Sequence, residues 1–147
     1  MVDPIRLHLA INHFPIFSLF TGIAVLLFGV LSNKQLIIQV ALVIVFFSGL
    51  VGIGVHVSGE EAEPAVKSLA GTSTHFLKEH EELADTSFAA GLILSGLSLA
   101  LFLILRFTEK KIKPALWLLI VCSAIVFGLY FTTAEQGGKI RHVELRE

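Results

Sequence analysis

Four long apolar runs decide what this chain of 147 residues can fold into. None of the runs contains Lys, Asp or Glu, and they cover residues 14–31, 36–55, 88–107 and 115–131. Each is close to the ~20 residues that a helix needs to cross the hydrocarbon core of a bilayer. We therefore expect a single all-α domain, a four-helix transmembrane bundle, with helices at about residues 4–32, 35–57, 73–107 and 114–134.

Two of these helices should begin well outside the bilayer. Asp3 and Pro4 are typical of a helix N-cap followed by proline in the first turn. They lie well before residue 14, where the first apolar run begins. The third helix similarly begins near Ser73, long before its own apolar run. We therefore expect helices one and three to extend beyond the bilayer on the side that carries both termini.

Basic residues indicate which side faces the cytoplasm. The two short connections opposite the termini contain five of the eleven Lys and Arg residues: Lys34, Arg106, Lys110, Lys111 and Lys113. The other six are spread over longer segments on the side of the termini, among most of the acidic residues. Because basic residues concentrate in short cytoplasmic loops, we expect a bacterial inner-membrane protein with both termini on the periplasmic side.

The histidines all lie on the side of the termini: His8, His13, His56, His75, His80 and His142. A polar residue at the end of a span explains His75, but His13 leads directly into apolar sequence, where a buried polar group is costly. Counting a rise of ~1.5 Å per residue from the opposite ends of the helices places His13 and His56 in one layer, at roughly 27–32 Å. His8 and His80 fall above them, at roughly 35–39 Å, where they can face each other.

Acidic residues gather at the same end of the predicted bundle. They occur in HVSGEEAEP (residues 56–64), KEHEELAD (78–85) and TAEQGGKIRHVELRE (133–147). Each run alone is equally consistent with a solvated loop, but together three segments bring histidine and glutamate to one place. These side chains are ligands for Zn, Fe and Cu(II). Asn12 or Glu144 is a candidate for hydrogen bonding to the second ring nitrogen of a ligating histidine.

Haem b is the competing cofactor. It needs two histidines on different helices that face each other across a gap, and His13 with either His56 or His80 would qualify. The twelve phenylalanines offer walls for a macrocycle, and the glycines of residues 49–55 offer room for its edge. Glycine equally permits close packing between membrane helices, so these features do not decide between the two cofactors.

Four short motifs resemble those of small four-span bacterial membrane proteins catalogued as domain of unknown function 2231. They are HLAINHFP (residues 8–15), SGEEAE (58–63), HEELA (80–84) and GGKIRHVEL (137–145). The resemblance covers nearly the whole chain, and it implies four spans and a metal or haem role. The candidate ligands that it marks are His8, His13, Glu60, Glu63, His80, Glu81 and His142. His56 lies outside these motifs and is an additional candidate.

The leading hypothesis is therefore a membrane protein with a redox-active His/Glu centre at its outer face, holding Fe, Zn or Cu. The first alternative is a bis-histidine haem b protein that transfers electrons to a partner. The second is an accessory subunit of a larger membrane complex, whose histidines form hydrogen bonds at an interface. The net charge of −1 gives no indication of nucleic-acid binding. Neither Gly-x-Ser-x-Gly nor His-Glu-x-x-His is present, so the sequence leaves open whether the chain is an enzyme.

Overall fold

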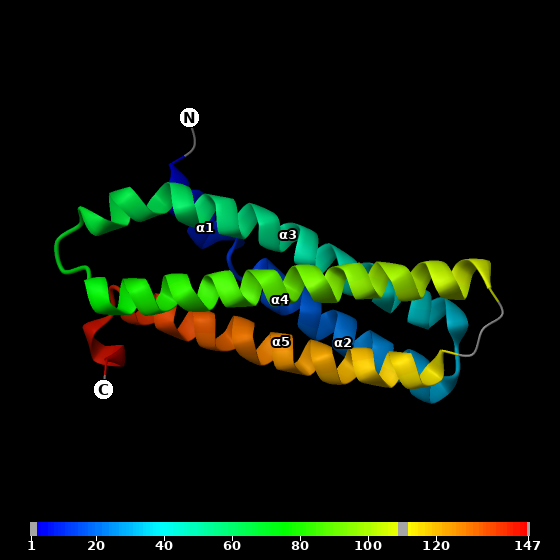
Figure 1. Ribbon diagram of the computed structural model, residues 1–147. Helices are drawn as coiled ribbons and strands as arrows, with labels where there is room; N and C mark the ends of the chain where they lie inside the picture. Colours follow the sequence, from blue (N-terminus) through cyan, green and yellow to red (C-terminus); the bar gives the residue numbers. More distant parts are fainter. Residues whose placement is uncertain (1–2, 109–111, 147) are drawn as a thin grey trace.

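Long helices make up almost all of the computed structural model, which describes residues 3–108 and 112–146. The elements are α1 (Pro4–Ile11), α2 (Phe14–Ser32), α3 (Gln35–Lys67), α4 (Thr74–Phe107), α5 (Lys113–Lys139) and a short 3₁₀ turn, η1 (Val143–Leu145). Both ends of the described chain lie at the same end of the bundle (Figure 1). The predicted all-α four-helix architecture is confirmed. Lys110 and Lys111, which contribute to the predicted basic side, lie outside the described residues.

The outer surface of the bundle is strongly apolar. α1 and α2 together, α3, α4 and α5 are each long and apolar enough to cross a membrane. Large side chains point outward along them, with Phe17 67%, Leu118 64% and Phe28 57% exposed. A water-soluble protein rarely exposes a continuous apolar surface of this extent. The chain is therefore a multi-pass membrane protein, and these side chains face lipid.

The helices form a ring in which α2 and α4 are diagonal. α2 packs against α3 and α5, and α4 packs against the same two helices. α1 departs from this ring, because it packs along α3 (Figure 1). The sequence predicts one helix with a kink over residues 4–32, whereas the structure has a break at Asn12 and His13. Pro15 explains the break, since proline has no N–H to donate to the carbonyl four residues earlier.

Small residues allow the helices to approach closely. A Cβ atom added to Gly49 would lie 2.5 Å from Ser95 Cβ and 2.8 Å from the backbone oxygen of Gly91. At the same contact, Ser95 Oγ donates a hydrogen bond of 2.7 Å to the backbone oxygen of Phe46. Close packing and hydrogen bonds of this kind hold membrane helices together, because lipid is as apolar as the side chains it would replace.

Helix α3 continues to Lys67, well past the end predicted near residue 57. The acidic run that was equally consistent with a loop is therefore helical. Glutamate and alanine are good helix formers, and Lys67 pairs with Glu63 one turn earlier. Pro64 is tolerated in this last part of the helix, where it removes a single backbone hydrogen bond.

The C-terminal tail folds back over the end of α5. The helix continues past residue 134, where the sequence predicts its end, runs through the glycines at 137 and 138, and stops at Lys139. Arg146 then donates from Nε to the backbone oxygen of Lys139 at 2.8 Å and from Nη2 to that of Ile140 at 2.7 Å. The oxygen of Ile140 also accepts a hydrogen bond from the backbone N–H of Ser73 at 3.2 Å. The tail therefore joins the end of α5 to the start of α4.

We predict that Gly49→Ala will lower the thermal stability of the detergent-solubilised protein. The new Cβ must displace the α4 backbone, and overpacking of this kind costs about 1–3 kcal/mol. The control is Gly96→Ala, because a Cβ at Gly96 meets no atom within 4 Å. A melting temperature for Gly49→Ala equal to that of Gly96→Ala would contradict the close α3–α4 contact.

Candidate functional site

His8 lies on α1 and forms a hydrogen bond to helix α3. Its Nδ1 atom lies 3.2 Å from the backbone oxygen of Val55 and 3.2 Å from Ser58 Oγ. The ring rests against Gly59, where an added Cβ would lie 3.2 Å from His8 Cε1. α1 reaches this position because Asp3 caps its first turn, accepting a 3.0 Å hydrogen bond from the backbone N–H of Ile5.

His80 lies on α4 and forms a hydrogen bond to helix α5 in the same way. Its Nδ1 atom lies 2.8 Å from the backbone oxygen of Thr133. The ring rests against Gly137, where an added Cβ would lie 3.0 Å from His80 Cε1. The hydroxyls of Thr133 and Ser87 share a further hydrogen bond of 2.8 Å, which fixes the α4–α5 contact two turns along α4 from the histidine.

The two histidine–helix contacts repeat one pattern in the two halves of the chain. In each, a histidine bonds a backbone oxygen on another helix, α3 for His8 and α5 for His80. It also packs against the glycine four residues after that oxygen: Val55 with Gly59, and Thr133 with Gly137. Both residues lie near the end of the bundle that carries the termini. α1 and α4 thus each turn one histidine toward the same end of the bundle core.

The pattern also determines which ring nitrogen is available. A backbone oxygen only accepts, so Nδ1 of each neutral ring must carry the proton. Nε2 then has a lone pair, and within the described ranges no hydrogen bond involves Nε2 of His8 or His80. A ligating histidine has this arrangement, with one ring nitrogen donating to a carbonyl and the other facing the metal.

The glutamates predicted as ligands are divided among other contacts. Glu60 lies 3.5 Å from His56 Nε2, and His56 also faces Asp85 at 3.9 Å and stacks on Phe88 with the ring centroids 4.2 Å apart. His56 therefore joins α3 to α4 at the surface of the bundle.

Glu63 and Glu81 both approach Lys67, which pairs with Glu63 and lies 3.9 Å from Glu81. Glu81 differs from the other acids because its Oε1 atom is buried and has no hydrogen-bond partner among the described residues. In the tail, Glu144 accepts a 2.9 Å hydrogen bond from His142 Nδ1, and both side chains are exposed.

His13 and Asn12 occupy the break between α1 and α2. His13 is exposed and starts α2 without a side-chain cap, while Asn12 ends α1 and has a buried Oδ1 atom without a partner in the part of the chain described. The structure thus holds His8 and His80 by the same kind of contact, on α3 and α5 respectively, and gives His13, His56 and His142 other surroundings. In residues 3–108 and 112–146, no three His, Cys, Asp or Glu side chains form a group that could hold a metal ion.

The residues that hold the histidines were not found from the sequence. None of these residues is titratable or a metal ligand: Val55, Gly59, Thr133 and Gly137. Their shared feature is a glycine four residues after the residue whose backbone oxygen accepts a hydrogen bond from another helix. Gly49, which the sequence also offered as room for a porphyrin edge, is used for packing against α4.

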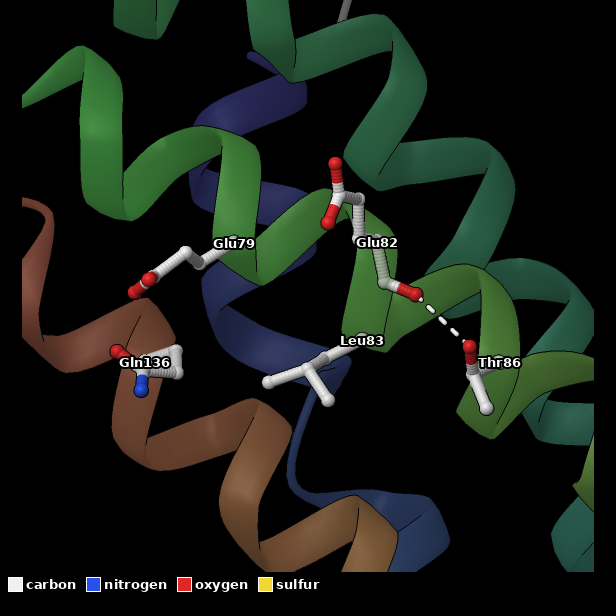
Figure 2. Close-up of a pocket in the computed structure, with 5 residues that line it drawn as sticks. All are labelled: Glu79, Glu82, Leu83, Thr86 and Gln136. Carbon is white, nitrogen blue, oxygen red and sulfur yellow. Dashed lines mark hydrogen bonds between the residues drawn. The ribbon is translucent and has the colours of Figure 1, made fainter.

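A cavity of about 410 Å³ lies near the same end of the molecule, between α4 and α5. It is lined by Glu79, Glu82, Leu83, Thr86 and Gln136 (Figure 2).

No family model, curated protein or solved structure matches this chain, so the resemblance to domain of unknown function 2231 stays a prediction.

We predict that His8 and His80 are Nδ1–H tautomers in the detergent-solubilised protein. Each Nδ1 must donate to a carbonyl, which fixes the proton there. Histidine-selective ¹⁵N labelling with long-range ¹H–¹⁵N correlation spectra checks this, and His8→Gln and His80→Gln assign the signals. An Nε2–H pattern for either residue would contradict its hydrogen bond from Nδ1 to the helix backbone.

Proposed function

We propose that this protein holds one haem b between His8 and His80 and transfers electrons at the outer face of the membrane. The observation that carries the proposal is the matched pair of histidines, each with Nδ1 bonded to a helix backbone and Nε2 unbonded among the described residues. His8 and His80 would hold the haem through their Nε2 atoms. A His/Glu centre needs a larger ligand group than the described chain assembles.

The residues around the two histidines fit such a group. Imidazole is a common axial ligand of haem iron, and donation from Nδ1–H to a carbonyl fixes ring orientation and raises ligand basicity. Gly59 and Gly137 form the cradles in which the rings sit, since a Cβ at either position would press on the ring. The protein therefore holds both rings before any cofactor binds.

A haem held by the two histidines would supply the exchange of single electrons. The contribution of the chain is orientation. Val55 and Thr133 fix the proton on Nδ1 and aim each Nε2 away from its supporting helix. The apolar surface of α2–α5 anchors this arrangement in lipid.

The location of the site follows from the charge pattern. Lys34, Arg106 and Lys113 lie at the end of the bundle opposite the histidines, and basic residues in short connections mark the cytoplasmic side. We therefore propose a bacterial inner-membrane protein with the site on the periplasmic side. Its electron partner would be a redox protein or a larger membrane complex that reaches this face.

A non-haem metal centre is the second candidate. The observation that favours it is Glu81, which directly follows His80 and has a buried Oε1 atom that makes no hydrogen bond in the described residues and only a 3.9 Å ion-pair contact with Lys67 Nζ. A carboxylate oxygen with two imidazole nitrogens is a ligand set for Fe or Zn, although in the described residues these side chains do not form one group, so this candidate requires them to move together. The two candidates differ in their dependence on this residue, because haem needs no carboxylate ligand.

The test is the visible spectrum of the detergent-purified protein, oxidised and then reduced with dithionite, after expression with added haem precursor. We expect a Soret band, sharp α and β bands on reduction, and about one haem per chain by pyridine haemochromogen assay. His8→Ala and His80→Ala should each lose at least most of the bound haem, because each removes one axial ligand. His13→Ala is the matched control and should retain it.

The outcomes separate the candidates. A blank visible region with stoichiometric Fe, Zn or Cu, lost in Glu81→Gln, would replace haem by the non-haem centre. Haem lost in His13→Ala and retained in His8→Ala would show that a different histidine pair is used. Protein without haem or metal would overturn both candidates and favour the accessory subunit.

A further inference from the structure

A shallow apolar groove lies between α3 and α4, near the end of the bundle opposite the termini. It has a volume of about 280 Å³ and is lined by Leu36, Gln39, Val40, Val43, Ile44 and Phe102. Leu36 and Val40 face outward, with 73% and 48% of their surfaces exposed. Both helices are membrane spans at this point, so the groove opens toward lipid. An acyl chain is therefore the apolar group available to fill it.

Two cations lie at the end of this groove. Arg106 follows Phe102 by one helical turn, so the two residues share a face of α4. Lys34 is the N-cap residue of α3. The start of α3 and the end of α4 are joined directly, because Gln35 Nε2 donates a 3.1 Å hydrogen bond to the backbone oxygen of Leu105. Both helices thus bring a positive charge to the same end of the apolar lining.

Carboxylates do not offset these charges in the part of the chain that the structure describes. The guanidinium carbon of Arg106 lies 5.7 Å from the ring centroid of Phe107, and its N–H groups make no hydrogen bond to a described residue. A guanidinium can bind two phosphate oxygens through parallel hydrogen bonds. The described acidic residues all lie at the end that carries the termini: Asp3, those within residues 60–63 and 79–85, Glu135 and Glu144. The end of the groove therefore attracts an anion.

Gln39 is the one polar residue in the lining of the groove. It follows Gln35 by four residues, which is about 6 Å along the helix, and its amide makes no hydrogen bond within the described ranges. The polar layer of a bilayer is roughly 5–8 Å thick on each side. A phospholipid crosses this layer between its phosphate and its ester carbonyls. With the phosphate beside Arg106, an ester carbonyl therefore reaches the depth of the Gln39 amide.

We propose that this groove binds an anionic phospholipid. The phosphate contacts Arg106 and Lys34, an ester carbonyl accepts a hydrogen bond from Gln39, and one acyl chain lies along Val40 and Phe102. A choline headgroup brings its own cation to an end of the bundle where the described side chains supply no carboxylate. A glycerol headgroup brings none, so the site selects phosphatidylglycerol. The proposal depends neither on the cofactor nor on which side of the membrane this end faces.

The experiment is native mass spectrometry of the detergent-purified full chain with equal amounts of dioleoyl-phosphatidylglycerol and dioleoyl-phosphatidylcholine. We expect the glycerol lipid to be retained at least about fivefold more than the choline lipid, which corresponds to about 1 kcal/mol. Arg106→Gln should lower this ratio at least about twofold, and adding Lys34→Gln should bring it to about one. Val40→Trp should lower the retention of both lipids at least about threefold, because the new ring fills the groove.

Lys113→Gln is the matched control for Arg106→Gln. Lys113 lies at the same end of the bundle, at the start of α5, where its Nζ atom donates a 3.1 Å hydrogen bond to Asn33 Oδ1. It does not line the groove, and α5 is diagonal to α3 in the ring. The variant removes one positive charge from this end and should keep the preference. A loss as large as that in Arg106→Gln would mean that the whole basic end attracts lipid, and the groove would not be the site.

Gln39→Leu tests the depth of the bound lipid. It should lower the retention of dioleoyl-phosphatidylglycerol, and it should leave unchanged the retention of the diether analogue, which has no ester carbonyl to accept from the amide. An equal effect on both lipids, or no effect on either, would contradict the contact with Gln39.

Three further results would overturn the proposal. The first is equal retention of the two headgroups by the unchanged protein. The second is displacement of the lipid by glycerol 3-phosphate at equal concentration, which would make the occupant a soluble phosphate. The third is a dimer that Val40→Trp dissociates while lipid retention stays constant, because a second copy of the chain would then fill the groove. Circular dichroism confirms that each variant remains folded before its ratio is used.

Discussion

Backbone oxygens of the helices are the acceptors on which this bundle depends. Each already accepts one hydrogen bond within its helix and keeps a second lone pair for a donor from a neighbouring helix. Ser95 uses the oxygen of Phe46 in this way, and Ser48 that of Pro15. Lipid removes most of the hydrophobic advantage of helix association, so such contacts and close approach decide which faces meet. The imidazoles of His8 and His80 bond helix oxygens by the same means, and the candidate site therefore continues the packing of the bundle.

The break at Asn12 and His13 gives the site its geometry. If α2 continued straight to the N-terminus, it would remain beside both α3 and α5. Pro15 interrupts the backbone hydrogen bonds, and the chain turns so that α1 packs along α3 alone. His8 consequently meets α3, while His80 meets α5, and the two rings approach from separate helix pairs. Pro15 thus determines that His8 contacts α3.

The sequence predicted the parts of this fold that depend on composition. Four apolar runs between polar connections specify the number of helices, and the early cap at Asp3 specifies where the first begins. Counting along the helices also placed His8 and His80 at one height. The sequence did not predict which way each side chain faces. His13 and His56 share a height as well, yet His13 is exposed at the break and His56 is held by Glu60 and Asp85. Rotation about the helix axis and the break at Pro15 depend on contacts between distant segments.

The two histidine–helix contacts lie in different halves of the chain, so they form at different times during synthesis. The residues that hold His8 end at Gly59, whereas those that hold His80 extend to Gly137. Ribosomes add about 5–20 residues per second, so several seconds of synthesis separate the two. During that interval the first half can complete its own contact while His80 still lacks α5. The proposed haem, which would need both rings, could be captured only after the last long helix has joined the others, so its loading would be a late step in biogenesis.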